Sequence, residues 1–364
     1  MLFRSQLTTA QVAALNTDQI RTLTSTDLNA LGTAQFTALS VAQVQNLTTA
    51  QIANLESDDL RTLSSANLRA LSTDQFAALS SDQMGQLTTA QVAAMTTAQL
   101  SSLTSTDLNA LSSDQMAALS SAQVAALSAT PQIANLTTDD LNSLGTAQFS
   151  TLSATQAAGL TNGQMSSLES QDLRAMSTNV IRSLSTAQIG ALTSDQMGQL
   201  TTAQVAALNT DQIRTLTSTD LNALGTAQFT ALGVAQVQNL TTAQIANLES
   251  DDLRTLSSAN LRALSTDQLG ALSSDQMGQL TTAQVANLTT AQLASLTSTD
   301  LNALATEQFA ALTTAQVAAL STNILLALTT DQVAKGLNTD MHATAAYRAH
   351  LIGVLTRRAV AVAK

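Results

Sequence analysis

The chain has 364 residues and a formal net charge of −11, with 45% hydrophobic residues but only 2% aromatic ones. It contains one proline and no cysteine, which excludes disulfides and thiolate metal sites. This acidity argues against nucleic-acid binding, which needs a basic face to neutralise phosphates. No stretch approaches 18 consecutive apolar residues, so we expect no transmembrane segment. The start, Met1–Gln6, lacks the apolar core of a secretory signal.

An eight-residue repeat fills most of the chain. Position 1 of each octad is usually Ser or Thr, position 4 is mostly Gln, position 5 is apolar and position 8 is nearly always Leu. The array consists of fifteen octads over 8–127, a nine-residue unit over 128–136, twenty-four octads over 137–328 and a nine-residue unit over 329–337. Such self-similarity at a fixed period is typical of solenoid proteins.

A longer repeat lies on top of the octads. Residues 8–87 recur as 201–280 with three changes, which indicates a recent duplication. A unique catalytic site inside this segment is therefore not expected, because every candidate residue would occur twice. Features that recur every 40 residues, such as Phe36 and Phe76, suggest that five octads contain a whole number of superhelical turns.

Each octad carries the signature of a helix start. In the first octad, Thr8 is suited to be the N-cap, and Gln11 lies three residues later, where its side chain can return to the Thr8 amide. Acidic residues at positions 3 and 4, such as Asp18 and Asp27, place negative charge beside the positive end of the helix dipole. The Ala-rich second half of the octad favours helix over strand.

A single continuous helix cannot accommodate this period. Eight residues advance by about 800°, so the apolar stripe would rotate by about 80° with every octad and face no single partner. We therefore predict an all-α solenoid, a superhelix of very short helices of about six residues, with one helix per octad and positions 5 and 8 inward. A β-solenoid with Thr and Gln ladders is the alternative fold, and disorder is a third, but strand alternation is missing.

The bends between helices are expected at position 1. Pro131 fits this prediction if Thr130 is the N-cap, because proline is tolerated at the first helical position. Glycines at position 1, Gly32, Gly145, Gly225 and Gly233, are expected to relieve strain at the bend. Because one short helix is unstable alone, stability should rise with the number of stacked repeats.

The C-terminal segment leaves the repeat and is basic. We predict three parts in the chain: a lead-in over 1–7, the array of 41 repeats over 8–337, and one amphipathic helix over 338–364. This helix is expected to cover the exposed core of the last repeat, and an export or docking signal, or binding to an anionic surface, is the alternative.

Two resemblances bear on these parts. The motif T-x-x-Q-φ-x-x-L, where φ is an apolar residue, resembles octapeptide arrays of large bacterial surface or secreted proteins, which implies a structural role. The run His342-Ala343-Thr344-Ala345-Ala346-Tyr347-Arg348-Ala349-His350-Leu351, with Val354–Ala359, resembles the last helix of the flavin-binding subunit of carbon monoxide dehydrogenase-type molybdenum hydroxylases. That likeness covers about 25 residues, and the glycine-rich flavin-binding segments are absent, so it implies no activity and no cofactor.

The residues needed for chemistry are sparse. A catalytic triad needs an imidazole base, and the only histidines, His342 and His350, are eight residues apart and point in different directions on a helix. The acidic pairs raise calcium as an alternative, but EF-hand spacing is missing and helix-start acids explain them better. Phe and Met at position 5 are interpreted as core. We expect no catalytic, cofactor-binding or metal-ligating residue; the acidic pairs are Asp58-Asp59, Asp139-Asp140 and Asp251-Asp252, and the position-5 residues include Phe36, Met84, Met116 and Met197.

The sequence thus favours a non-enzymatic structural repeat protein, an extended spacer, scaffold or surface filament. The alternative is a binding module that holds a polypeptide or glycan on outward rows of Gln, Asn and Asp or in the superhelical groove. Self-association or a protein partner is a further expectation. An extracellular or cell-surface location is favoured, with the cytoplasm as the alternative.

Overall fold

The computed structural model describes residues 7–328, and this part of the protein is entirely helical, with no strand. It holds 39 α-helices of four to six residues and one 3-10 helix, essentially one helix per repeat. The predicted all-α solenoid of very short helices is therefore confirmed. The second nine-residue unit and the predicted C-terminal helix lie outside the described residues.

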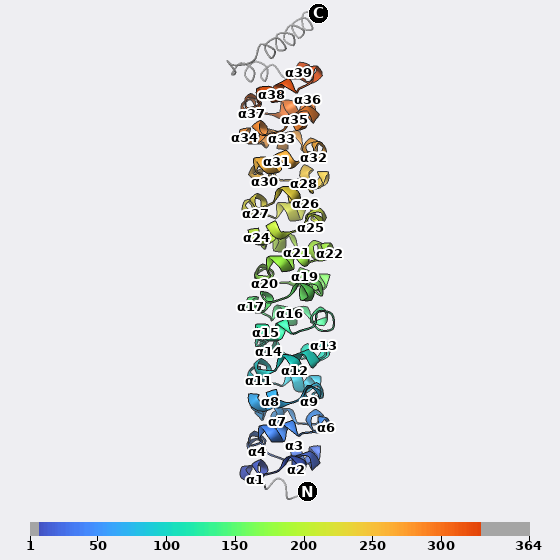
Figure 1. Ribbon diagram of the computed structural model, residues 1–364, viewed down its shortest axis with the longest axis vertical. Helices are drawn as coiled ribbons and strands as arrows, with labels where there is room; N and C mark the ends of the chain where they lie inside the picture. Colours follow the sequence, from blue (N-terminus) through green and yellow to red (C-terminus); the bar gives the residue numbers. More distant parts are fainter. Residues whose placement is uncertain (1–6, 329–364) are drawn as a thin grey trace, which may run out of the picture. The chain divides into compact units, whose positions relative to one another are not determined.

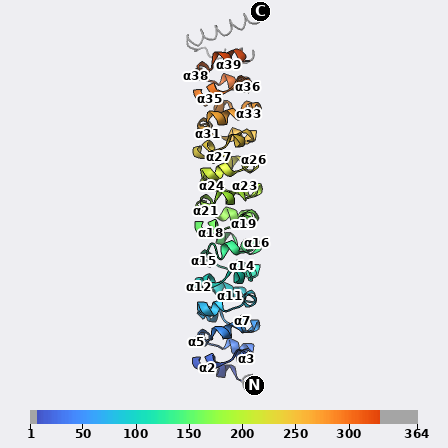
Figure 2. The same ribbon diagram turned by 90° about the vertical axis from the view of Figure 1, so that its right-hand side faces the viewer.

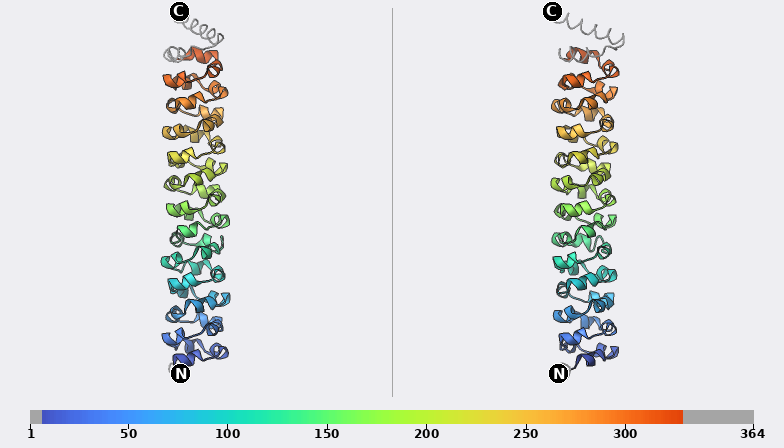
Figure 3. Two further views of the ribbon diagram at one scale, coloured as in Figure 1. Left: turned by 60° about the vertical axis from the view of Figure 1, so that its left-hand side comes forward. Right: turned by 90° about the vertical axis from the view of Figure 1, so that its left-hand side faces the viewer.

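The chain divides into two compact units, Met1–Leu192 and Thr193–Lys364. In each unit the short helices follow one another around a common axis and stack in layers (Figure 1, Figure 2 and Figure 3). The first unit contains α1(Thr9–Ala13), α2(Thr17–Thr22), α3(Ser25–Asn29), α4(Thr33–Thr37), α5(Val41–Gln45), α6(Thr49–Ala53), α7(Ser57–Thr62), α8(Ser65–Ala70), α9(Thr73–Ala77), α10(Ser81–Gly85), α11(Thr89–Ala94), α12(Thr97–Ser102), α13(Ser105–Leu108), α14(Ser113–Ala117), α15(Ser121–Ala125), η1(Ile133–Asn135), α16(Thr138–Asn142), α17(Thr146–Phe149), α18(Ala154–Ala158), α19(Asn162–Ser167), α20(Ser170–Ala175), α21(Thr178–Ser183) and α22(Thr186–Gly190). The second contains α23(Ser194–Gln199), α24(Thr202–Ala207), α25(Thr210–Thr215), α26(Ser218–Asn222), α27(Thr226–Thr230), α28(Val234–Gln238), α29(Thr242–Ala246), α30(Ser250–Thr255), α31(Ser258–Ala263), α32(Thr266–Gly270), α33(Ser274–Gln279), α34(Thr282–Ala286), α35(Thr290–Ser295), α36(Ser298–Ala303), α37(Thr306–Ala310), α38(Thr314–Ala318) and α39(Thr322–Ala327).

Most of the described helices begin with a pair of reciprocal hydrogen bonds. In α6, the Gln51 amide N–H donates to Thr48 Oγ1 at 3.1 Å, and the Thr48 amide N–H donates to Gln51 Oε1 at 2.7 Å. These two bonds satisfy backbone donors that the first turn of a helix leaves without a partner. The short helix then closes with a hydrogen bond from the Leu55 amide to the Ile52 carbonyl, and the chain passes to the next helix through Glu56 in an extended conformation.

The bend at position 1 uses ordinary backbone conformations. Thr24 has φ −73° and ψ 159°, and Gly32 has φ −80° and ψ 164°, both in the extended region that any residue adopts. No described residue has a positive φ. The prediction that the position-1 glycines relieve strain is therefore wrong, because the junction is unstrained with Ser or Thr in place; this applies to Gly32, Gly145, Gly225 and Gly233.

The nine-residue unit over 128–136 corrects a second expectation. Thr130 is not an N-cap and Pro131 is not in a helix; both lie in a wide turn that the Ile133 amide closes onto the Ser128 carbonyl at 3.0 Å. Ser128 keeps the position-1 role, because its amide donates to Gln132 Oε1 at 2.8 Å. The extra residue is thus absorbed between positions 1 and 4, and a short 3-10 helix replaces the α-helix.

The core runs along the axis of each unit. Positions 5 and 8 are buried as predicted: Ile52 is 0% exposed and Leu55 is 4% exposed. Helices three octads apart pack against each other, as α1 does on α4 and α28 on α31. Hydrogen bonds between successive turns join residues 25 to 31 positions apart, or 32 across the nine-residue unit 128–136, so one turn takes between three and four octads. Five octads therefore do not contain a whole number of turns, contrary to the 40-residue expectation.

Candidate functional site: the inter-turn glutamine bridges

The glutamine at position 4 makes a second set of hydrogen bonds that joins one turn to the preceding turn. Gln51 is 4% exposed, and its Nε2 donates to the Ile20 carbonyl at 2.9 Å and to the Leu23 carbonyl at 2.7 Å. The acceptors are the position-5 and position-8 carbonyls four octads earlier. Since Oε1 already accepts the Thr48 amide, a single side chain both starts its own helix and fastens that helix to the turn before it.

We call these contacts the inter-turn glutamine bridges, and they recur throughout both units. In each case Nε2 donates to one or more backbone carbonyls 28 to 32 residues earlier. A buried backbone carbonyl without a donor is costly, so each bridge satisfies groups that the short helices leave open. The bridging side chains include Gln43, Gln75, Gln83, Gln91, Gln99, Gln115, Gln123, Gln132, Gln156, Gln164 and Gln188 in the first unit, and Gln236, Gln244, Gln268, Gln276, Gln284, Gln292 and Gln316 in the second.

Asparagine at position 4 keeps the bridge but changes the cap. The Asn67 Nδ2 donates to the Leu39 carbonyl at 3.0 Å, and Asn260 Nδ2 donates to the Leu232 carbonyl at 2.9 Å, both 28 residues earlier. The Asn67 amide still donates to Ser64 Oγ, but no return bond from Asn67 to the Ser64 amide is found in residues 7–328. A side chain one methylene shorter therefore reaches the carbonyl of the preceding turn.

Aspartate at position 4 occurs in two settings. After a position-1 Thr, the carboxylate accepts from the cap: Asp220 accepts the Thr217 hydroxyl at 2.6 Å and the Thr217 amide at 3.1 Å. After a position-1 Glu, the glutamate makes no side-chain cap bond. We call the three Glu-x-x-Asp octads, 56–63, 169–176 and 249–256, the gap octads, because their aspartates supply no amide donor for a bridge.

The gap-octad carboxyls have perturbed acidity. Burial, together with the charges of Glu56 and Asp58, raises the pKa of Asp59 from 3.8 to about 6. Burial likewise raises the pKa of Asp252 to about 6, helped by Glu249 and Asp251.

Burial also raises the pKa of two further carboxyls. Burial, with help from Glu169, raises the pKa of Asp172 to about 6. At Asp140 burial also raises the pKa, against the lowering effect of the hydrogen bond from the Thr137 hydroxyl. Desolvation disfavours the charged form, and a donated hydrogen bond restores part of the loss.

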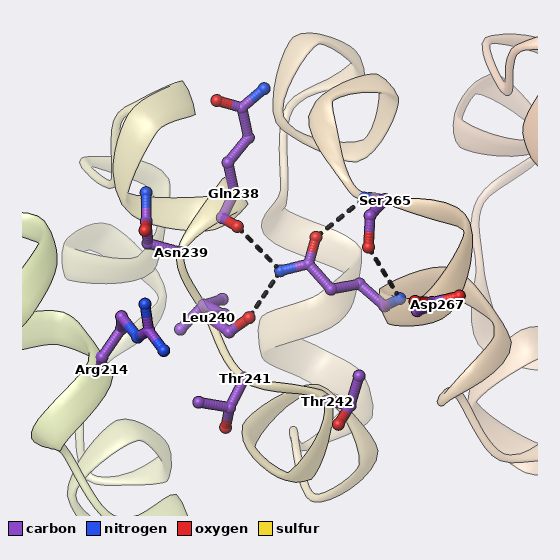
Figure 4. A pocket seen from close by; sticks show the side chains of 9 residues that line it. Arg214, Gln238, Asn239, Leu240, Thr241, Thr242, Ser265 and Asp267 are labelled. Atoms are coloured by element: carbon purple, nitrogen blue, oxygen red, sulfur yellow. Dashed lines mark hydrogen bonds between the residues drawn. The ribbon is translucent and has the colours of Figure 1, made fainter.

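Matching open pockets occur at equivalent places in the two units. One of about 280 Å³ is shown in Figure 4, where the Arg214 side chain lies beside the loop Asn239–Thr241 and Asp267 lies on the opposite side. Its counterpart in the first unit, of about 270 Å³, has Arg21 and Asp74 in the same roles. The hydrogen bonds in Figure 4 are the bridge from Gln268 to the Gln238 and Leu240 carbonyls and the cap between Gln268 and Ser265, so the pocket opens beside an inter-turn glutamine bridge.

The acidic pairs singled out in the sequence lie in the first turns of helices. Asp58-Asp59 begins α7, Asp139-Asp140 begins α16 and Asp251-Asp252 begins α30. Among residues 7–328 no three His, Asp or Glu side chains gather closely enough to hold a metal ion. None of the helices in that range is both long and apolar enough to span a lipid bilayer. Met and Phe at position 5 lie in the core, as the 0% exposure of Phe36 and Met116 shows. His342 and His350 lie outside the described residues.

Comparison with protein families identifies the repeat. The ALTTAQ repeat matches residues 23–55, 52–89, 92–129, 104–138, 133–170, 165–202, 215–249, 245–282, 279–314 and 301–339, well over half of the chain. The chain belongs to the ALTTAQ repeat family. The six letters run from position 7 of one octad to position 4 of the next, and they stand unchanged at 311–316. No curated protein matches the chain.

In an ALTTAQ octad, the final Gln of the motif is thus the residue with two structural roles, and sequence reasoning found only one. The cap was expected, whereas the rows of Gln were expected to face outward in a binding module; they are buried instead, as Gln91 at 2% exposure illustrates. A signal was present: no octad has Glu at position 4, although Glu serves a capping box as well as Gln does. Only the amide can also donate to a carbonyl.

Proposed function

We propose that this ALTTAQ array is a non-enzymatic structural element, an extended spacer or scaffold, and that it works as a filament at a bacterial cell surface. The observation that carries the proposal is the use of positions 1, 4, 5 and 8 in every typical octad for caps, bridges and core. Half of each typical repeat therefore serves the fold itself, through caps, bridges and core. The resemblance of the octads to arrays in large bacterial surface or secreted proteins supports the location.

Fractionation of the source cell tests this proposal. Surface proteolysis of intact cells, followed by detection of the protein with an antibody to the repeats, should remove the signal, while a cytoplasmic marker stays intact. A pool confined to the soluble cytoplasm and protected from protease would contradict the surface-filament function.

A binding module is the second candidate, and the matching pockets favour it. Arg21 and Arg214 make no hydrogen bond or ion pair among the described residues, so each guanidinium is available to an acidic group on a peptide or glycan. The protein should then bind members of an acidic peptide or glycan array, and the double variant Arg21→Ala with Arg214→Ala should lose that binding. Equal binding by both proteins would eliminate this candidate.

A further inference from the structure

The three gap octads share a defect that the other octads do not have. Asp59 is 6% exposed, Asp172 is 1% exposed and Asp252 is 5% exposed, and no hydrogen bond to their carboxyl oxygens is present among residues 7–328. Asp172 Oδ1 is completely buried and has no partner. A buried carboxylate without donors is costly, so these positions need an explanation beyond a helix cap.

The register of the bridges identifies what faces each carboxyl. Where position 4 is Gln or Asn, as at Gln51 and Asn67, the side chain donates to the position-8 carbonyl 28 residues earlier. For Asp59 that carbonyl belongs to Leu31, and no donor to it is found within the described range. The same spacing places Leu144 before Asp172 and Leu224 before Asp252. Each gap octad thus brings a carboxyl toward a backbone oxygen that lacks a hydrogen bond, and neither group in its usual state can donate.

A second kind of buried polar atom lacks a hydrogen-bond partner at the same junctions. The Asn29, Asn142 and Asn222 side chains, 27 residues before the three position-1 glutamates, donate to backbone carbonyls but leave buried Oδ1 atoms without partners. At a related junction that has Thr in place of Glu, Asn109 Oδ1 accepts the Thr137 amide at 3.3 Å. The gap octads are therefore incompletely bonded on both sides of the turn boundary.

The neighbouring octad shows that a side chain of this length can close the gap. Asn67, in the octad directly after 56–63, reaches the Leu39 carbonyl with Nδ2 at 3.0 Å. A protonated aspartic acid has the size and shape of asparagine, and its O–H is a donor where the ionised form has none. One proton would therefore supply the bond that an amide supplies elsewhere.

We propose that Asp59, Asp172 and Asp252 are proton-dependent bridges, each of which fastens its turn to the preceding one only when the carboxyl is protonated and donates to the carbonyl of Leu31, Leu144 or Leu224. The gap octads are then held weakly to the preceding turn near neutral pH and are held by an additional hydrogen bond at mildly acidic pH. The inference concerns the internal mechanics of the array and holds for a spacer or a binding module alike.

The acidic charges around the gap octads favour the protonated form of each carboxyl. Asp59 has Glu56 and Asp58 on its own octad, with Arg61 on the exposed side, and α4, on which α7 packs, carries no charge. Asp82, an exposed acidic residue, lies on α10, three octads later along the chain.

The second unit repeats this arrangement. Asp252 has Glu249, Asp251 and Arg254 on its octad, no charge on α27, and Asp275 on α33. An open pocket of about 470 Å³ beside Asn222 and Glu249 gives water and protons a route to the junction. The third carboxyl, Asp172, has Glu169 and Arg174 on its octad and no charge on α17 below it.

The direction of the pH effect follows from these acidities. The pKa of Asp59 in the folded chain, about 6, lies above its ordinary value of 3.8, so the folded state binds the proton more tightly than the unfolded state does. The stabilising contribution is complete below the ordinary value and is lost as the pH rises through about 6. Acidification from about pH 7.5 to about pH 5 should lower the local opening equilibrium about tenfold at each gap octad.

Amide hydrogen exchange on the full-length protein tests the proposal, with correction for the intrinsic pH dependence of exchange. Peptides from 56–63 and 249–256 should be about tenfold better protected near pH 5 than near pH 7.5. In the variant Asp59→Asn with Asp252→Asn, the protection near pH 7.5 should already reach the acid level and should not change with pH. Asp114→Asn, which replaces an exposed first-turn aspartate, is the matched control and should leave the pH dependence of both peptides intact.

Two results would overturn the proposal. The first is wild-type protection of the gap octads that does not differ between the two pH values. The second is a pH dependence that persists unchanged in the Asn double variant, since this would assign the effect to other groups. Thermal unfolding of both proteins, followed by circular dichroism, shows that the variants are folded at both pH values.

Discussion

Replacement of Gln51 by glutamate separates the two roles of the position-4 side chain. Glutamate keeps the oxygen that accepts the Thr48 amide but loses the Nε2 donor to the Ile20 and Leu23 carbonyls. Two lost hydrogen bonds at about 0.5–1.5 kcal/mol each, together with the cost of a charge placed against two acceptors, give a destabilisation of about 2–5 kcal/mol near neutral pH.

Two variants provide matched controls. Gln19→Glu makes the same chemical change at an exposed residue whose side chain takes part only in the cap, so its effect should stay below about 0.5 kcal/mol. Gln51→Asn should keep a bridge to Leu23, as Asn67 does to Leu39, and lose the cap, at a cost of about 1 kcal/mol.

Local hydrogen exchange is the appropriate assay, because a repeat array does not unfold in a single step. The octad 241–248 has the same sequence as 48–55 and serves as an internal reference in every Gln51 variant. If Gln51→Glu opens its octad no more readily than Gln19→Glu opens 16–23, the inter-turn glutamine bridges do not stabilise the array.

Three further predictions concern packing and register. Gly85→Ala should destabilise the protein by about 1–3 kcal/mol, because the new Cβ would lie 2.8 Å from the Ala110 carbonyl oxygen. Gly270→Ala should stabilise the protein by about 0.5–1 kcal/mol, because nothing lies within 4 Å of the new Cβ. Thermal melts of the two variants test this difference. Phe76→Ala should lower the free energy of unfolding by about 3–5 kcal/mol. Phe76→Leu should lower it by less than about 1.5 kcal/mol, because Leu269 fills the duplicated position at 0% exposure. Chemical denaturation measures both effects. Removal of one whole octad should preserve a helical protein with a thermal melt close to that of the wild type, whereas removal of half an octad should disrupt every bridge that crosses the deletion. Equal thermal melts of the two deletion variants would contradict the register of the bridges.

The local structure was predictable from the sequence because it depends on contacts within one octad. The cap between Thr48 and Gln51 spans three residues, and the burial of Ile52 and Leu55 follows from their spacing. The failed expectations involve partners about 28 residues away, whose identity depends on how many octads complete a turn. Bend geometry was the missing quantity, since a period of eight residues fixes the helix starts but not the angle between helices.

Pro131 and the buried Gln side chains also depend on partners about 28 residues away, which the octad alone does not predict. Proline suits the first position of a helix, but here the register of the bridge from Gln132 to the Leu100 and Leu103 carbonyls decides the local structure, and the extra residue forms a wide turn. A polar residue such as Gln91 is expected at the surface when only its own octad is considered. Its burial makes sense only once the Leu60 and Leu63 carbonyls of the preceding turn are in place.

The exchange of glutamine side-chain amide protons tests the central claim most directly. In the full-length protein with ¹⁵N-labelled glutamine, the Nε2 protons of bridging residues such as Gln51 and Gln91 should exchange slowly, whereas those of the exposed Gln19 should exchange at the rate of a free amide. Uniformly fast exchange of all glutamine side chains would contradict the account, because it would mean that no amide holds one turn to the next.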